Sequence, residues 1–122
     1  MGKQDYLRHP EGSIYSSGYG IIPKAVMQNQ DLSIEAKAIY AYLCSFMGAG
    51  DTAFPSVRKI CYDLGINVKR YYRHIDKLIE LGFIAKKRTY YKASGKWANN
   101  TYCINYEVAR ASIEEEKQTY NA

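Results

Sequence analysis

Four cations recur between residues 69 and 77 at intervals that suit one face of a helix: Lys69, Arg70, Arg73 and Lys77. Advancing by about 100° per residue places three of them opposite Ile75, with Lys69 at the edge of the same face. A guanidinium group carries paired N–H donors that match the acceptors of a phosphate or of a guanine edge, whereas an ammonium group binds a phosphate as a point charge. The chemistry open to this face is therefore the binding of a polyanion.

The other side of the same helix is apolar. It comprises the residues expected within about 60° of Ile75, namely Val68, Tyr71, Tyr72, Leu78 and Ile79. We expect these side chains to face the core and the cations to stay outside. Asp76 and Glu80 leave a second interpretation open, because they could pair with Arg73 or Lys77 three or four residues away and leave only a solvated face.

A helix with such a basic face fits the major groove of duplex DNA, which is about 12 Å wide. There we expect Arg70 and Arg73 to read bases, because guanidinium groups match guanine. Lys69 is expected to reach a phosphate or a base edge, and Lys77 a phosphate. The expected contacts also include Asn67 at the start of this helix and, from the helix before it, Ser56 and Arg58.

A second basic segment follows the helix. Residues 83–91 predict a strand, residues 93–96 a turn, and residues 100–106 a returning strand. Three cations of this hairpin are predicted DNA contacts: Lys96 at the tip, with Arg88 and Lys92 behind it. Protection of an edge strand by lysine is the alternative.

Tyr90, Tyr91 and Trp97 interleave with the hairpin cations. This pattern leaves open the stacking of these rings on single-stranded bases. We favour a structural role for Trp97, packing the hairpin against the helices, because the single tryptophan of a small domain usually buries much of its surface.

The elements that must position these residues are three helices and the hairpin. Helices are predicted at about 33–47, from Ser56 to about residue 64, and at about 68–81. Ser33 and Ser56 suit N-caps, Gly65 suits the left-handed conformation after a helix, and Asn67 suits the next cap. Pro23 is expected to open a short helical turn. The predicted fold is mainly α with a β-hairpin: a winged helix-turn-helix, with a three-helix core plus wing and an extra C-terminal helix.

The chain divides into three predicted parts. Residues 1–18 are expected to form a flexible arm with a short strand near residues 13–17, residues 19–106 the winged-helix DNA-binding domain, and residues 107–122 a polar C-terminal helix. The helix and the arm could also support a homodimer, since many such domains bind two half-sites.

Composition narrows the class of protein. The chain has 122 residues, 47% of them hydrophobic, and a net charge of +5. Residues 56–96 hold eleven cations against three acids, whereas the rest holds six cations and nine acids. This concentration of positive charge in one part of the sequence favours a nucleic-acid partner. No apolar run is long enough for a membrane span, and the first residues lack the apolar core of a signal peptide, so we expect a cytoplasmic protein.

The sequence contains no motif typical of a catalytic site or a metal-binding site. The three cysteines, Cys44, Cys61 and Cys103, are widely spaced and form no CxxC pair, so the first two are expected to pack in the core. His9 and His74 have no second ligand at metal spacing. No Ser-His-Asp set, phosphate loop or carboxylate pair is visible. We expect no enzyme activity, no metal and no cofactor.

Several short motifs in order carry a family resemblance. Residues 32–40 (LSIEAKAIY), 54–56 (FPS), 64–66 (LGI) and 81–84 (LGFI) resemble the helix-turn-helix domains of Gram-positive mobile elements. Such domains occur in plasmid and phage replication initiators of the RepA type, in DnaD-like proteins and in related regulators. The resemblance covers about residues 20–106. It implies a winged helix, double-stranded DNA binding in the bacterial cytoplasm, and recognition-helix positions at Lys69, Arg70 and Arg73.

The process served stays open at this stage. The resemblance does not separate replication initiation from transcriptional regulation, and a replication or transcription protein could be a further partner. A competing hypothesis is a protein-interaction module, in which the winged helix packs on another protein of a larger assembly.

Overall fold

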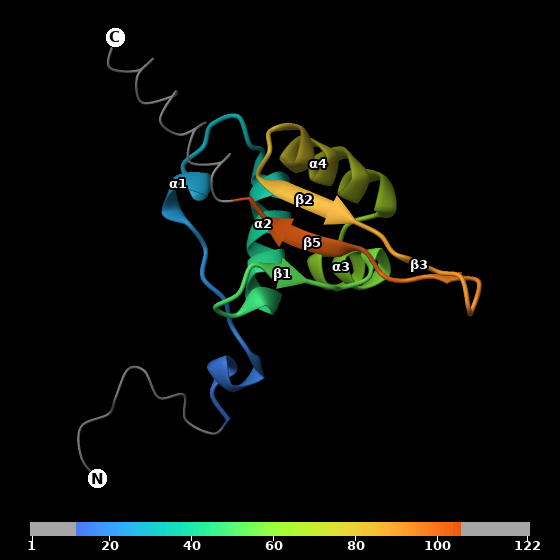
Figure 1. The fold of residues 1–122 in the computed structure, drawn as a ribbon. Coiled ribbons are helices and arrows are strands. Elements are labelled where there is room, and N and C mark those ends of the chain that lie inside the picture. The colour runs from blue at the N-terminus through green and yellow to red at the C-terminus, as the bar shows by residue number, and fades with distance from the viewer. Residues whose placement is uncertain (1–11, 106–122) are drawn as a thin grey trace.

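The computed structural model describes residues 12–105. In chain order the helices are η1 (Ile14–Ser17, a 3₁₀ helix), α1 (Lys24–Met27), α2 (Ile34–Met47), α3 (Val57–Leu64) and α4 (Val68–Glu80). The strands are β1 (Thr52–Ala53), β2 (Ile84–Lys87), β3 (Tyr90–Tyr91), β4 (Lys96–Trp97) and β5 (Thr101–Ile104). Figure 1 shows α2, α3 and α4 gathered beside a small sheet, from which a hairpin projects.

The predicted caps define the helices. Ser33 Oγ accepts a hydrogen bond from the Ala36 amide at 3.0 Å, and Ser56 Oγ accepts one from the Lys59 amide at 3.1 Å. Such bonds satisfy amide groups that have no partner inside the helix. The short turn after Pro23 is also present, as α1. The predicted boundaries of these helices are therefore confirmed to within about one residue.

The sheet has one strand more than predicted. Strands β1, β5 and β2 form an antiparallel sheet in that spatial order, so β5 lies in the middle. The predicted single strand over residues 83–91 is wrong in one respect, because the chain leaves the sheet after Lys87. Strand β3 then pairs only with β4 in a separate two-stranded sheet. The arrangement is winged-helix-like.

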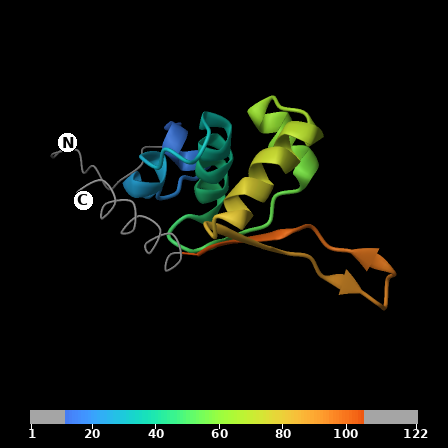
Figure 2. The same ribbon diagram turned by 90° about the horizontal axis from the view of Figure 1, so that it is seen from above.

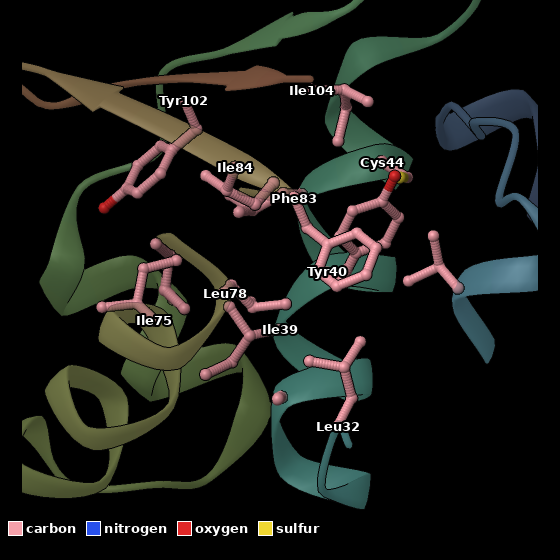
Figure 3. Close-up of a cluster of buried hydrophobic side chains, with 14 of the residues drawn as sticks. Leu32, Ile39, Tyr40, Cys44, Ile75, Leu78, Phe83, Ile84, Tyr102 and Ile104 are labelled. Atoms are coloured by element: carbon pink, nitrogen blue, oxygen red, sulfur yellow. The ribbon is translucent and has the colours of Figure 1, made fainter. Parts of the chain in front are cut away.

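The core lies between the three helices and the sheet. Ile39 and Leu43 of α2, Ile75 of α4 and Tyr102 of β5 are fully buried. Figure 3 shows the side chains of the sheet facing those of α2 and α4 across this core. Cys44 and Cys61 are buried as expected.

One secondary-structure prediction and two packing predictions are wrong. Residues 13–17 were predicted to include a strand, but residues 14–17 form η1. Val68 is 49% exposed and Tyr72 is 44% exposed, although both were assigned to the inner face of α4. Val68 begins the helix and therefore extends past the core, and Tyr72 lies at the edge of the apolar stripe. The predicted arm up to residue 11, Tyr106 and the C-terminal helix lie outside the described residues.

Candidate nucleic-acid interface

Helices α3 and α4 are joined by a turn of three residues. Gly65 ends α3 with a φ of 68° and a ψ of 35°, the left-handed conformation that glycine adopts without steric cost. The Ile66 amide donates to the Cys61 carbonyl at 3.0 Å, which closes the end of α3. Asn67 Oδ1 then accepts from the Arg70 amide at 2.8 Å and begins α4. The predicted helix–turn–helix is therefore present, with its predicted glycine and cap.

Helix α4 has one buried face and one exposed face. Tyr71, Ile75 and Leu78 are buried against α2 and the sheet. Figure 2 shows α4 between α2 and α3, above the strands that lead to the hairpin. Burial of the apolar face holds the helix in place, so that its polar face is presented to solvent.

Three of the four predicted cations of α4 are available to a ligand. Lys69, Arg73 and Lys77 are exposed. Within residues 12–105 none of their side chains forms a hydrogen bond or an ion pair, and the side chains of Asp76 and Glu80 form none either. The interpretation in which these acids neutralise their neighbours therefore has no support in the described part of the chain.

Arg70 differs from these three cations. Its Nε lies 3.2 Å from Oε2 of Glu35, in the first turn of α2, and its side chain is 43% exposed. We expected Arg70 to read bases in the same way as Arg73, but Arg70 is paired with a carboxylate of another helix. The terminal amino groups of the guanidinium have no partner among the described residues, so the contact orients Arg70 without occupying all of its donors.

His74 takes part in the same cluster. Its Nε2 lies 2.7 Å from Oε2 of Glu35, and its Nδ1 lies 3.0 Å from Oγ of Ser33. The hydrogen bond from Arg70 is the largest influence on the pKa of Glu35 and lowers it. Desolvation, the next largest, opposes this effect, but the charges of Arg70 and His74 and the hydrogen bond from His74 lower the pKa further, so that it stays below its ordinary value. Glu35 and Ser33 were missed as site residues, because no spacing within one helix signals pairs that are 35 or 41 positions apart.

Two of the predicted contacts, Ser56 and Asn67, also act as helix caps. The Ser56 hydroxyl oxygen is engaged as an N-cap, as is the Asn67 amide oxygen, so these groups are already used as acceptors. Arg58 is exposed and has no ion pair within the described residues. Its neighbour Lys59 instead pairs with Asp63 at 3.3 Å.

The hairpin carries its predicted cations away from the body of the domain (Figures 1 and 2). Arg88, Lys92 and Lys96 are all exposed. Arg88 Nε donates to the Ala98 carbonyl at 3.2 Å, so this residue also braces the base of the hairpin. Lys92 and Lys96 form no ion pair in the part of the chain that the structure describes.

The packing predicted for Trp97 is wrong. Its side chain is 57% exposed and lies on β4 against Tyr90 and Arg88 rather than against the helices. The hairpin pairs only with itself, so no core surface is within reach of this ring.

Residues 30–84 match the family model described as a helix-turn-helix domain. The match runs from just before α2 to the first residue of β2, somewhat less than half of the chain, and the hairpin lies beyond it. No curated protein matches the chain. Helix α4 is the second helix of the helix-turn-helix, which is the position of the recognition helix. This position is consistent with binding to double-stranded DNA.

Among residues 12–105, no three His, Cys, Asp or Glu side chains gather where they could hold a metal ion. No helix in this range has the length and apolar character that a membrane span requires.

Proposed function

We propose that this helix-turn-helix domain binds double-stranded DNA with α4 in the major groove. The observation that carries the proposal is the exposed, unpaired set Lys69, Arg73 and Lys77 on a helix whose other face is buried. Unpaired cations can replace the counterions of the DNA backbone at no cost in lost internal ion pairs. Arg73 is the residue best suited to read a base, because its guanidinium group is not engaged elsewhere in the described residues.

We further propose that binding is sequence-specific and serves replication initiation or transcriptional regulation of a bacterial mobile element, in the cytoplasm and without catalysis. The order of short motifs in residues 32–84 supports this finer assignment by resemblance. Arg70, oriented by Glu35, is proposed as a second base or phosphate contact. Lys77, Arg88, Lys92 and Lys96 are proposed as phosphate contacts.

The test is duplex binding measured by fluorescence anisotropy, first on random-sequence DNA and then on sites selected from a random library. If about five phosphates are neutralised, the logarithm of affinity should fall with the logarithm of salt concentration at a slope of roughly −4 to −5. Arg73→Ala should cost about 1–3 kcal/mol on the selected site and relax the base preference there. Lys24→Ala, which removes an exposed cation of α1, is the matched control and should have little effect.

Two outcomes would contradict the proposal. Equal losses for Arg73→Ala on selected and random DNA would mean that Arg73 touches only phosphate. Absence of duplex binding at low salt would favour the alternative of a protein-interaction module.

A further inference from the structure

The hairpin exposes aromatic rings that the core does not use. Tyr90 is 46% exposed, Tyr91 56% and Trp97 57%, and none of them belongs to the buried cluster. Strands β3 and β4 pair only with each other, and Figure 2 shows them extending beyond the helices. These rings therefore lie outside the core and remain accessible to a ligand.

Two of these rings form a preassembled surface with an arginine. Tyr90 and Trp97 are directly opposite each other in the register of β3 and β4, so their side chains share one face of the hairpin. Their ring centroids are 4.9 Å apart at an interplanar angle of 49°. The guanidinium carbon of Arg88 lies 5.3 Å from the centre of the Trp97 ring, and Arg88 Nε is held by the Ala98 carbonyl. We call Arg88, Tyr90 and Trp97 the wing platform.

The charge around the wing platform identifies the chemistry of its ligand. Residues 82–105 contain five cations, Lys86, Lys87, Arg88, Lys92 and Lys96, and no acid. A surface that combines exposed aromatic rings with cations alone complements a ligand made of flat rings linked by phosphates. In an intact duplex the faces of the bases are covered by their neighbours, so only an unpaired base offers its face to such a platform.

We propose that the wing platform stacks on an unpaired base of a single strand that adjoins the duplex held by α4. This inference rests on the proposed function, because α4 supplies the duplex contact. The protein would then favour DNA with a local opening or a single-stranded tail over the fully paired form. Lys92 and Lys96 would keep their proposed contacts with phosphates of the duplex, next to the stacked base.

Trp97 is the only tryptophan of the chain, so its fluorescence reports directly on the wing platform. The experiment compares a blunt duplex with the same duplex carrying a short oligothymidine tail. We expect the tail to quench Trp97 emission and to strengthen binding about tenfold, whereas the blunt duplex should bind with little quenching. A mixed-sequence duplex serves as the common core of both probes.

Variants separate the contribution of ring stacking to affinity from the contribution of charge. Binding of each variant is followed through a dye on the DNA. Trp97→Ala should remove the advantage of the tailed probe and leave affinity for the blunt duplex unchanged. Trp97→Phe, which keeps a ring, should retain most of that advantage. Lys92→Gln should weaken both probes alike. Far-ultraviolet circular dichroism checks that each variant is folded, which we expect because Trp97 lies outside the core.

The possible failures are distinguishable. If the blunt duplex binds but the tail adds neither affinity nor quenching, the wing platform proposal is overturned and the role of α4 stands. A tail advantage that survives Trp97→Ala overturns it as well. If the blunt duplex does not bind at all, the proposed function of α4 fails.

Discussion

The carboxylate of Glu35 receives the Nε donor of Arg70 at 3.2 Å, which joins the first turn of α2 to the first half of α4. His74 adds a second contact to the same oxygen at 2.7 Å. The helix proposed to enter the groove is thus tied through two side chains to a helix of the core. An oriented guanidinium loses less conformational freedom when it meets a base than one that is mobile.

Glu35→Gln should therefore weaken the discrimination between a selected site and random duplex more than it weakens the affinity for duplex DNA. Loss of the negative charge releases Arg70, so preference for a selected site over random duplex should fall severalfold. Affinity for random duplex should stay constant or rise, because the repulsion between Glu35 and phosphate is removed. Competition binding on the two DNAs measures both quantities.

A double-mutant cycle provides the control for this first prediction. In an Arg70→Ala background, Glu35→Gln should cause no further loss of discrimination, because the group that Glu35 orients is gone. Additive effects of the two changes would show that Glu35 does not act through Arg70.

The lowered pKa of Glu35 predicts a dependence of stability on acid pH. The hydrogen bond from Arg70 is the main cause, and a folded-state pKa below the unfolded value stabilises the fold above the ordinary pKa of 4.5. That stabilisation should disappear as pH falls through the lowered folded-state pKa. Urea unfolding from neutral pH to below 4.5 should therefore show a shallower decline for Glu35→Gln than for the natural chain.

Asp63 provides a comparison in the same pH range. Its pKa is also lowered, chiefly by the hydrogen bond from the Tyr42 hydroxyl and also by Lys59. Asp63→Asn should remove the contribution of Asp63 to the loss of unfolding free energy at acid pH. The contribution of Glu35 should stay unchanged. Parallel stability curves for the natural chain and Glu35→Gln would contradict the assignment.

A buried hydroxyl pair connects α4 to the root of the hairpin. The hydroxyl groups of Tyr71 and Tyr102 are hydrogen-bonded, and Asn100 Nδ2 donates to the Tyr102 oxygen at 3.2 Å. Tyr71→Phe should cost about 1 kcal/mol of unfolding free energy, because the Tyr102 hydroxyl keeps one partner. Tyr102→Phe should cost more, since its hydroxyl contacts both groups. Urea unfolding measures the loss of unfolding free energy in each variant. Equal losses, or a larger loss for Tyr71→Phe, would contradict the prediction.

Gly20 is required by a close approach of two backbones. A Cβ atom at this position would lie 1.7 Å from the carbonyl oxygen of Cys44 in α2. Gly20→Ala should lower the unfolding free energy by about 1–3 kcal/mol, because the segment before α1 must move away from α2. Gly50→Ala is the control, since its Cβ would lie 3.2 Å from the Met47 carbonyl oxygen and needs only a small adjustment. Similar losses in thermal unfolding would show that the Gly20 segment is not tightly packed.

Local signals in the sequence were enough to determine the helices and the turn between them. Ser33, Ser56 and Asn67 cap the helices that follow them, and Gly65 takes the left-handed conformation. These signals work because caps and turns depend on hydrogen bonds within a few residues. Tyr102 and Ile104 lie two residues apart on the predicted returning strand, so the period of two places both on the same, buried face.

Contacts between distant segments were decided by the tertiary structure alone. Strand β1 has two residues and no pattern of its own, and it exists because β5 offers a free edge to Thr52 and Ala53. Arg70 looks equivalent to Arg73 along the chain, yet the packing of α2 against α4 brings only Arg70 to Glu35. Trp97 is exposed because its hairpin leaves the sheet after Lys87. Sequence spacing describes one element at a time, whereas each of these outcomes depends on where a second element lies.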